Sequence, residues 1–295
     1  MALALLGCGR AASTHGEAPR APGLPLPPGL DVAVRVDLAA LSGELGAPLT
    51  QKMLLDAVGV DAVRPRLFER CLSRAGLLWW GLLPPTNATA VEDVVVMRGH
   101  FASLLTDAPG ERWSRRPSGV SELDPAEDSG APQASLYRLP GDELLVWAPR
   151  TEAERIEQAF DDARLQTVLR PPERGAVSVA AAPGPLLRSF GARFPNLAAQ
   201  FAGVQQVEAF AEPTAGAWRA EVSLDFETAA QATQASEVME RLKEALGRGT
   251  CAVGVMARST FISRFEKTLR VQAWLLGADV EVVQACVFGT GCCAG

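Results

Sequence analysis

A chain of 295 residues is long enough for one large domain or for two of ordinary size. Its hydrophobic content of 48% and its charged content of 21% are close to globular averages. The net charge of -6 argues against a nucleic-acid-binding surface, which needs an excess of basic residues. Beyond residue 10, no stretch approaches the ~18–20 apolar residues that span a bilayer, so we expect a soluble body.

The first ten residues contain the motif Leu5-Leu6-Gly7-Cys8. An apolar run, a small residue and then a cysteine resemble the lipobox of bacterial lipoprotein precursors. Two features depart from that family's pattern: no Lys or Arg precedes the apolar run, and the run is shorter than the usual ~7–15 residues. A start codon further upstream would explain both. The resemblance implies that residues 1–8 are a remnant of a signal peptide with its lipobox, and that Cys8 carries the lipid.

Residues 9–29 have no helical or strand period. Their five prolines favour extended conformations, so we interpret this segment as a semi-rigid tether rich in Pro, Ala and Gly. An anchor, a tether and a folded body would hold the protein on a bilayer without spanning it, because several acyl chains together give durable attachment. The alternative is a cytosolic protein with a disordered N-terminus and a chance Leu-Leu-Gly-Cys motif.

The first predicted module covers residues 30–170 and mixes strands with helices. Alternation of Val32, Val34 and Val36 with less apolar residues predicts a half-buried strand over 30–38. Thr151 and Glu154 have the spacing of a helix capping box. In chain order we then expect helices over 41–58 and 61–74, strands over 77–83 and 94–97, a short helix over 101–105, a surface loop over 109–133, a hairpin of strands 135–139 and 143–147, and a helix over 151–163.

The second predicted module covers residues 174–295 and ends in a cysteine-rich tail. Thr228 and Gln231 form a second capping-box pattern, at the start of a long helix that reaches about residue 246. The other expected elements are a strand over 176–180, a helix over 186–201 interrupted at Pro195, antiparallel strands over 204–210 and 218–226, a helix over 256–267, a strand over 269–276, and a last helix or strand over 279–288.

The two parts share local patterns. Both "LDVAVRVDLAALSGEL" and "RGAVSVAAAPGPLLRSF" predict a strand, a turn and a helix, and "ELLVWAPRTEAERIEQAFDDA" matches "EVSLDFETAAQATQASEVMERL" in the same way. We therefore predict an α+β fold of two similar modules, each a mainly antiparallel sheet with helices packed on one face. This layout resembles uncharacterised envelope lipoproteins of GC-rich bacteria, a resemblance that implies location and architecture but no chemistry.

The sequence contains no recognisable catalytic motif. Nucleophile, phosphate-loop and dinucleotide-binding patterns are absent, and we predict no catalytic residue, no metal and no cofactor. Of the two histidines, His15 lies in the tether. His100 follows Arg98 at a junction after a strand, where a helix N-terminus could hold an anion, although a structural role is the simpler interpretation.

The remaining cysteines divide into two groups. Cys71 has the spacing of a buried residue on a helix. The others, which lie in the last 45 residues, are candidates for a disulfide that fixes the tail in an oxidising compartment. A thiolate metal site lacks a suitable cysteine pair, and unpaired thiols are a third alternative. The disulfide candidates are Cys251, Cys286, Cys292 and Cys293.

These observations favour a membrane-tethered, non-catalytic binding or structural module of the bacterial envelope, facing the periplasm or the cell surface. Its predicted partners are a lipid bilayer, through the acyl anchor, and envelope proteins. The alternative is a periplasmic hydrolase that uses acidic residues or His100 in a cleft between the modules.

Overall fold

The computed structural model describes the chain from residue 26 to residue 276, with gaps. The described residues are 26–46, 50, 54, 65–84, 92–101, 113–123, 134–140, 143–162, 167–185, 187, 195–249, 254 and 257–276.

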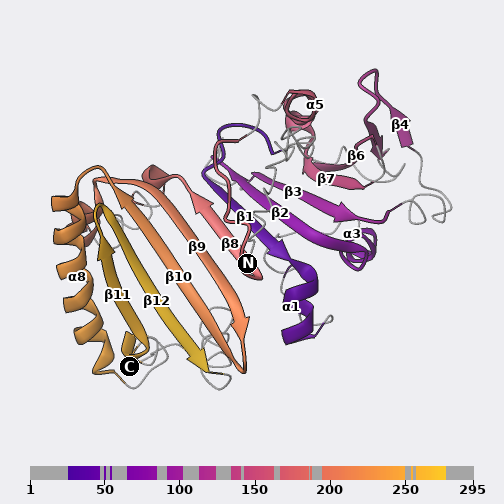
Figure 1. The fold of residues 1–295 in the computed structure, drawn as a ribbon. Coiled ribbons are helices and arrows are strands. Elements are labelled where there is room, and N and C mark those ends of the chain that lie inside the picture. Colours follow the sequence, from indigo (N-terminus) through magenta and orange to yellow (C-terminus); the bar gives the residue numbers. More distant parts are fainter. Residues whose placement is uncertain are drawn as a thin grey trace, which may run out of the picture.

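All of the described strands belong to one antiparallel sheet of 12 strands (Figure 1). Their order across the sheet is β11-β12-β10-β9-β8-β1-β2-β3-β7-β6-β5-β4. The strands of the first half are β1 (Val32–Asp37), β2 (Ala75–Leu83), β3 (Glu92–Gly99), β4 (Trp113–Arg115), β5 (Ser121–Leu123), β6 (Ala134–Arg138) and β7 (Leu144–Pro149). Those of the second half are β8 (Val177–Ala181), β9 (Val204–Thr214), β10 (Ala217–Phe226), β11 (Thr260–Phe265) and β12 (Thr268–Leu276).

The two halves repeat one strand order, which confirms the prediction of two similar modules. Outward from the centre, the first half runs β1-β2-β3-β7-β6 and the second runs β8-β9-β10-β12-β11. Strands β1 and β8 pair with each other, so the sheet continues from one half into the other. The first half carries β5 and β4 in addition, outside β6.

Helices pack on one side of both halves, which we call the α8 side. Helices α1 (Leu38–Leu45) and α3 (Pro65–Leu72) contribute to the core of the first half, and α8 (Ala229–Gly247) to that of the second. Short helices α7 (Pro195–Ala198) and η3 (Ala199–Phe201) precede β9, and η3 contacts α8. The Asp37 side chain begins α1 by accepting a hydrogen bond from the backbone N–H of Ala40 at 3.0 Å.

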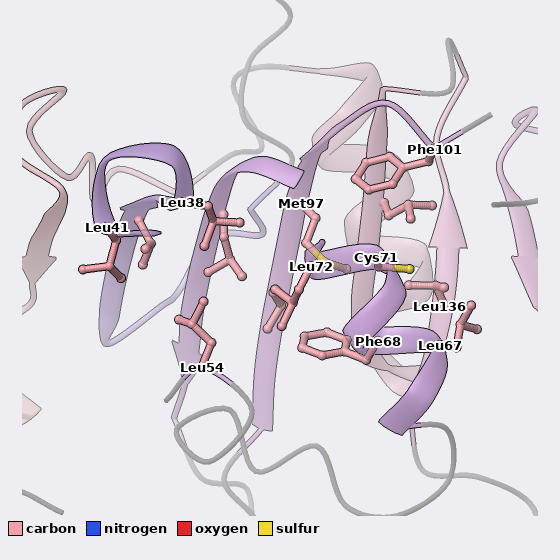
Figure 2. Close-up of a cluster of buried hydrophobic side chains, with 14 of the residues drawn as sticks. Leu38, Leu41, Leu54, Leu67, Phe68, Cys71, Leu72, Met97, Phe101 and Leu136 are labelled. Carbon is pink, nitrogen blue, oxygen red and sulfur yellow. The ribbon is translucent and has the colours of Figure 1, made fainter. Parts of the chain in front are cut away.

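The core on the α8 side of the first half is shown in Figure 2. Leu38 and Leu41 come from α1, and Phe68 and Leu72 from α3, and they gather over the apolar strand residues around Met97. These residues repeat at helical spacing in the helices and at every second position in the strands, which brings both sets to a single interface.

The opposite side of the first half, the α5 side, is also closed. Helix α5 (Ala153–Asp161), which follows the 3₁₀ turn η1 (Arg150–Glu152), packs Ile156 against buried residues of β3 and β7. Leu26 and Leu30 complete this core. A Cβ placed on Gly81 would lie 2.7 Å from a Leu30 methyl carbon, so a side chain at this position would require Leu30 to shift.

Several elements predicted from the sequence are present in the structure. The capping box of Thr228 and Gln231 is present at the start of α8. Strands β6 and β7 form the predicted hairpin, and β1, β2, β3, β8, β9, β10 and β12 lie where strands were predicted, with shifted ends.

Other predictions were wrong. The predicted loop 109–133 contains the hairpin β4–β5, because Gly119 at φ +86° turns the chain and Leu123 is buried. The predicted helix 256–267 contains strand β11, because a turn through Glu266 pairs it with β12. Thr151 does not cap α5, since it lies within η1 and the helix begins after Glu152, which makes no side-chain capping bond.

Two further corrections concern the second half and the proposed repeat. Pro195 begins α7 rather than interrupting a helix, in keeping with the preference of proline for a first turn. The strand order makes β7 equivalent to β12, so the segment of β7 and α5 does not correspond to that of β10 and α8. The other sequence match, between the segments of β1 and β8, is confirmed.

Candidate functional site

The α5 side of the second half differs from that of the first because no described helix lies on it. We call the α5-side residues of β8–β12 the open face. Its central row crosses the five strands as paired residues: Ser178, Phe210, Glu221, Gln272 and Phe261. Helix α8 packs on the other side, against Ile262 and Leu269. No described helix covers the open face, although its central residues Ser178, Phe210 and Glu221 are themselves buried.

The equivalent row of the first half is small and apolar. With Val34 and Val179 as equivalent residues, Ala33 corresponds to Ser178, Gly81 to Phe210 and Val94 to Glu221. Ala33 and Val94 are fully buried under α5 and the N-terminal segment. The two halves thus share a backbone plan but have opposite chemistry on this side.

A charged cluster occupies the centre of the open face. Glu221 is only 2% exposed, and one of its carboxylate oxygens accepts hydrogen bonds from Arg219 at 2.8 Å and from Gln272 at 2.7 Å. The other oxygen accepts from Arg174 at 3.5 Å, and Arg219 also reaches Glu212 at 3.2 Å. We call these five residues the charged centre. A buried carboxylate with this many donors is fully compensated.

Residues 167–176, which lead into β8 and which we call the connector, close one end of the charged centre. Arg174 belongs to this connector, and its guanidinium carbon lies 3.9 Å from the centroid of the Phe210 ring. The Ser178 hydroxyl donates to the carbonyl of Pro172 at 2.6 Å, and Arg35 of β1 donates to the carbonyl of Gly175 at 3.3 Å. These contacts hold a cation over an aromatic ring at a defined position.

The surroundings of Glu221 fix its ionisation. Burial by itself would raise the pKa of the Glu221 carboxyl, but the hydrogen bond from Gln272 and the charges of Arg174 and Arg219 outweigh that effect. The pKa of Glu221 is therefore lowered, and the carboxylate stays ionised at neutral pH. A carboxylate held in this way acts as a hydrogen-bond acceptor rather than as a proton donor.

Large apolar side chains on β11 and β12 border the charged centre. Phe261 is 61% exposed, Trp274 47% and Leu276 63%. Phe261 is the edge-strand residue of the central row, and Trp274 and Leu276 follow on β12 toward the end of that strand. Phe265, which is 69% exposed, lies at the other end of β11. We call Phe261, Trp274 and Leu276 the apolar rim. Exposed aromatic residues beside ordered arginines are typical of protein-binding surfaces.

The sequence-predicted pair Arg98 and His100 lies elsewhere, at the end of β3. His100 is exposed, and its backbone N–H approaches the Arg74 carbonyl at 3.4 Å. Arg98 pairs with Glu143 at 3.8 Å, with both side chains more than half exposed. This position is on the surface and does not provide the burial that the hydrolase hypothesis requires around a catalytic histidine.

The cysteine predictions are mostly outside the described residues. Cys8, Cys251, Cys286, Cys292 and Cys293 all lie there, so the lipidation site and the disulfide candidates stay predictions. Cys71 lies on α3 and is buried in the core, as its sequence spacing predicted.

A second ionic cluster fixes α5 to the first half. Arg116 donates to Glu122 at 2.7 Å and to Glu157 of α5 at 2.9 Å, and Arg150 lies 3.2 Å from Glu122. Burial, followed by the charge of Glu122, raises the pKa of the Tyr137 hydroxyl to about 12. This cluster joins a loop, a strand and a helix, and we assign it a structural role.

Sequence reasoning did not identify the charged centre. The only available indication was that Glu221 and Ser223 alternate with apolar residues along β10, which marks a polar side of a strand. That pattern is common to every solvent-facing strand. The contacts of Glu221 with Arg174 and Gln272 join residues about 50 positions apart in the sequence. The order of β9, β10 and β12 in the sheet brings these residues together.

Two kinds of feature are absent from the described residues. No group of three or more side chains of the metal-ligating types lies together in that part of the chain. Among the helices described, none has the length and apolar character needed to cross a membrane.

Comparison with known proteins gives a match in fold. No protein-family model and no curated protein sequence matches the chain. Solved structures of TP0453 do match: crystal form I gives a TM-score of 0.52 at 11% identity, covering 91% of this chain and 98% of that one. Crystal form III gives 0.51 at 12% identity, covering 88% and 96%. At this identity, the likeness shows that the two chains share a fold over nearly their whole lengths.

Proposed function

We propose that this protein is a lipid-anchored, non-catalytic module of the bacterial envelope that binds an envelope protein on its open face. The anchor is supported by the Leu-Leu-Gly-Cys motif at Cys8 and by the proline-rich residues that follow it. The binding role is supported by one observation above all. The second half repeats the strand order of the first, but on its α5 side it carries charged and aromatic residues where the first carries a closed core.

The tether was predicted to reach residue 29, but residues 26–29 pack on the body, so the proposed tether ends before Leu26. Leu26 is fully buried, and its carbonyl accepts a hydrogen bond from Thr167 at 2.9 Å. Arg155 of α5 donates to the carbonyl of Pro28 at 2.7 Å. The chain is thus attached to the body from Leu26 onwards. At ~3 Å per residue for a proline-rich segment, residues 9–25 would let the body stand up to about 50 Å from a membrane.

The composition of the open face favours a protein partner. Arg174, Arg219 and Trp274 are residue types that contribute strongly to protein interfaces. The charged centre is held by its own hydrogen bonds, so a partner would meet side chains that are already ordered. Preorganised side chains lose little conformational entropy on binding, which favours affinity.

Metabolic labelling with palmitate tests the anchor. The gene is expressed with its native upstream codons, as wild type, as Cys8→Ala and as the control Cys286→Ala. We expect label and membrane association for wild type and Cys286→Ala, and neither for Cys8→Ala. An unlabelled, soluble wild type would refute the anchor.

Photo-crosslinking in cells tests the binding face. A benzophenone amino acid replaces Phe265 on the open face, and the matched control carries it at Val168, which is 91% exposed on the connector. We expect an adduct of one defined mass from position 265 that is absent from position 168. If both positions give the same adducts, or if position 265 gives none, the open face is not the binding surface.

The hydrolase alternative is not favoured by any observation on the described residues. Arg98 and His100 lie exposed on the surface, and the charged centre holds its carboxylate ionised and fully hydrogen-bonded. We therefore do not propose it as a second function.

A further inference from the structure

Strand β11 is the outermost described strand of the second half, at the edge of the 12-stranded sheet (Figure 1). Its equivalent in the first half is β6, because Leu136 and Ile262 take the same place in the two strand orders. Strand β6 pairs with β7 on one side and with β5 on the other. Strand β11 pairs with β12, and no described strand lies beyond it. The second half therefore has an edge at the place where the first half continues.

Two exposed phenylalanines lie along this edge, on the open face. Phe261 is 61% exposed and Phe265 is 69% exposed, whereas their equivalents Ser135 and Leu139 are 5% and 1% exposed. The Ser135 hydroxyl donates to the carbonyl of Leu123 in β5 at 3.2 Å. In the first half, the strand added beyond β6 thus goes together with burial of the positions that β11 leaves exposed.

Strand β11 lacks the features that usually keep an edge strand from pairing. Sheet edges are protected by shortness, by proline, by bulges or by several charged residues. The opposite edge strand of this sheet, β4, is only three residues long and ends in Arg115. Strand β11 has six residues, no proline, a regular register with β12 and one charged residue, Arg264. An edge of this kind is a template for a further strand.

The backbone of β11 directs hydrogen-bonding groups away from the sheet at alternate residues. Phe226 donates its backbone N–H to the carbonyl of Lys267 at 2.9 Å, which makes these two residues a hydrogen-bonded pair of β10 and β12. Because the bonding direction alternates along a strand, the even-numbered residues of β12 bond toward β11, where Ser263 receives them. The N–H and C=O groups of its neighbours Ile262 and Arg264 therefore point outward.

We propose that β11 pairs antiparallel with β11 of a second copy of the chain, about a two-fold axis at Ser263. This register places Ile262 opposite Arg264 of the other copy, so the outward backbone groups of both strands meet. On the open face it places Phe261 opposite Phe265 of the other copy, twice over. Directly opposed aromatic side chains stabilise a strand pair, and the two copies present the same surface to each other, as a two-fold interface requires.

Neighbouring registers suit the strand less well. An axis at Arg264 would place two guanidinium groups directly opposite each other, which is destabilising. An axis at Ile262 would place Phe261 opposite Ser263 and separate the phenylalanines. The fold already contains a pairing of the proposed kind, because β1 and β8 are equivalent strands that pair antiparallel with Val34 opposite Val179.

This inference is independent of the lipid anchor and of the proposed envelope partner. The paired strands extend the sheet in its own plane, so the charged centre of each copy stays on the open face. In cells, a photo-adduct of twice the chain's mass from position 265 reports the β11 pairing, and an adduct of another mass reports an envelope protein. The two proposals can therefore fail separately.

Disulfide crosslinking of the purified, non-acylated full chain tests the register. Phe261→Cys and Phe265→Cys are oxidised separately and as a mixture, and crosslinked peptides are identified by mass spectrometry. In the mixture the two new cysteines lie opposite each other, with Cα atoms about 4.5 Å apart, within disulfide range. In either variant alone they lie ~13 Å apart along the strands, beyond that range. We expect the 261–265 linkage in the mixture only. No such linkage, or links to native cysteines in its place, would overturn the proposal.

Sedimentation equilibrium of two serine variants tests the dimer without crosslinking. Ser263 and Ser223 both lie directly opposite Arg270 on the open face, on either side of β12, so Ser→Glu places a carboxylate beside the same arginine in each variant. Only Ser263→Glu brings two like charges together at the two-fold axis. We expect it to raise the dimer dissociation constant by about tenfold or more, and Ser223→Glu to leave the constant unchanged. A monomeric wild type, or equal constants for the two variants, would contradict the pairing.

Discussion

Val34 of β1 lies directly opposite Val179 of β8, and this pair is the point about which the two halves of the sheet correspond. A single row of paired residues runs outward from it in both directions. All of its members are apolar and all lie on the α8 side: Leu136, Trp147, Val95, Trp80, Val34, Val179, Ala209, Val222, Val271 and Ile262. The residues one position further along each strand lie on the α5 side, and there the side chains of the two halves differ.

The charged centre should make the protein less stable at acid pH. The pKa of Glu221 is lower in the folded protein than its ordinary value of 4.5, so its contribution is complete above that value and is lost as pH falls through the folded pKa. Glu221→Gln should lower the free energy of unfolding at pH 7 by on the order of 2–4 kcal/mol, because it leaves two arginines without their buried partner. Urea unfolding at pH 7 and pH 3 measures both effects.

Glu212→Gln is the matched control for this prediction. Glu212 contacts Arg219 as well, but its side chain is 29% exposed, so its loss should cost less than about 1 kcal/mol. If the two variants are equally stable, the burial of Glu221 has no energetic consequence and the charged centre is only a surface ion pair.

Asp93 on β3 should have the opposite pH dependence. Burial raises its pKa from 3.8 to about 6, against an opposing contribution from Trp80. The folded state therefore holds the proton more tightly than the unfolded state, and stability falls as pH rises from about 4 to above 6. As pH rises from 4 to 7.5, the free energy of unfolding of Asp93→Asn should increase by on the order of 2 kcal/mol relative to that of wild type. A constant difference in unfolding free energy across that range would contradict the assignment.

Gly81 should be required for closure of the first half. A methyl group there would lie 2.7 Å from Leu30, in a core where neighbours cannot move freely. Gly81→Ala should therefore cost about 1–3 kcal/mol in unfolding free energy. Gly76→Ala, on the same strand, meets nothing within 4 Å and should change stability little. Thermal unfolding of the two variants, with wild type alongside, measures the difference, and equal losses would show that Leu30 does not need this space.

Arg116 should be important for holding α5 in place. Its replacement by Ala removes the contacts to Glu122 and Glu157 together, and should increase amide hydrogen exchange in α5 by at least tenfold. Arg98→Ala removes only an exposed pair with Glu143 and should leave exchange unchanged. Unchanged hydrogen exchange in α5 of Arg116→Ala would mean that apolar packing by Ile156 is sufficient to hold the helix in place.

Local patterns predicted the elements whose signals are contained within a few residues. The Thr228 capping box and the β6–β7 hairpin are examples, since a cap or a tight turn depends on neighbours in the chain. Strand β11 was predicted as part of a helix because residues 256–267 have few turn signals before Glu266. Its pairing with β12 determines its structure, and pairing is not visible in a local window.

The candidate site was less predictable for the same reason. Arg174 lies shortly before β8, and its contact with Phe210 requires the chain to return through β9. Glu221 is polar on an alternating strand, and its burial without a covering helix among the described residues distinguishes it from an ordinary surface residue. The equivalence of the two halves reveals that difference, and it required the complete strand order.

The most direct test of the lipid-anchored module is mass spectrometry of the mature N-terminus. The protein is produced with its native upstream codons, purified from washed membranes and digested, and its first peptide is identified. We predict a peptide that begins at Cys8 and carries acyl chains on that residue. An unmodified peptide that includes Met1 to Gly7, recovered from a soluble protein, would contradict the proposal.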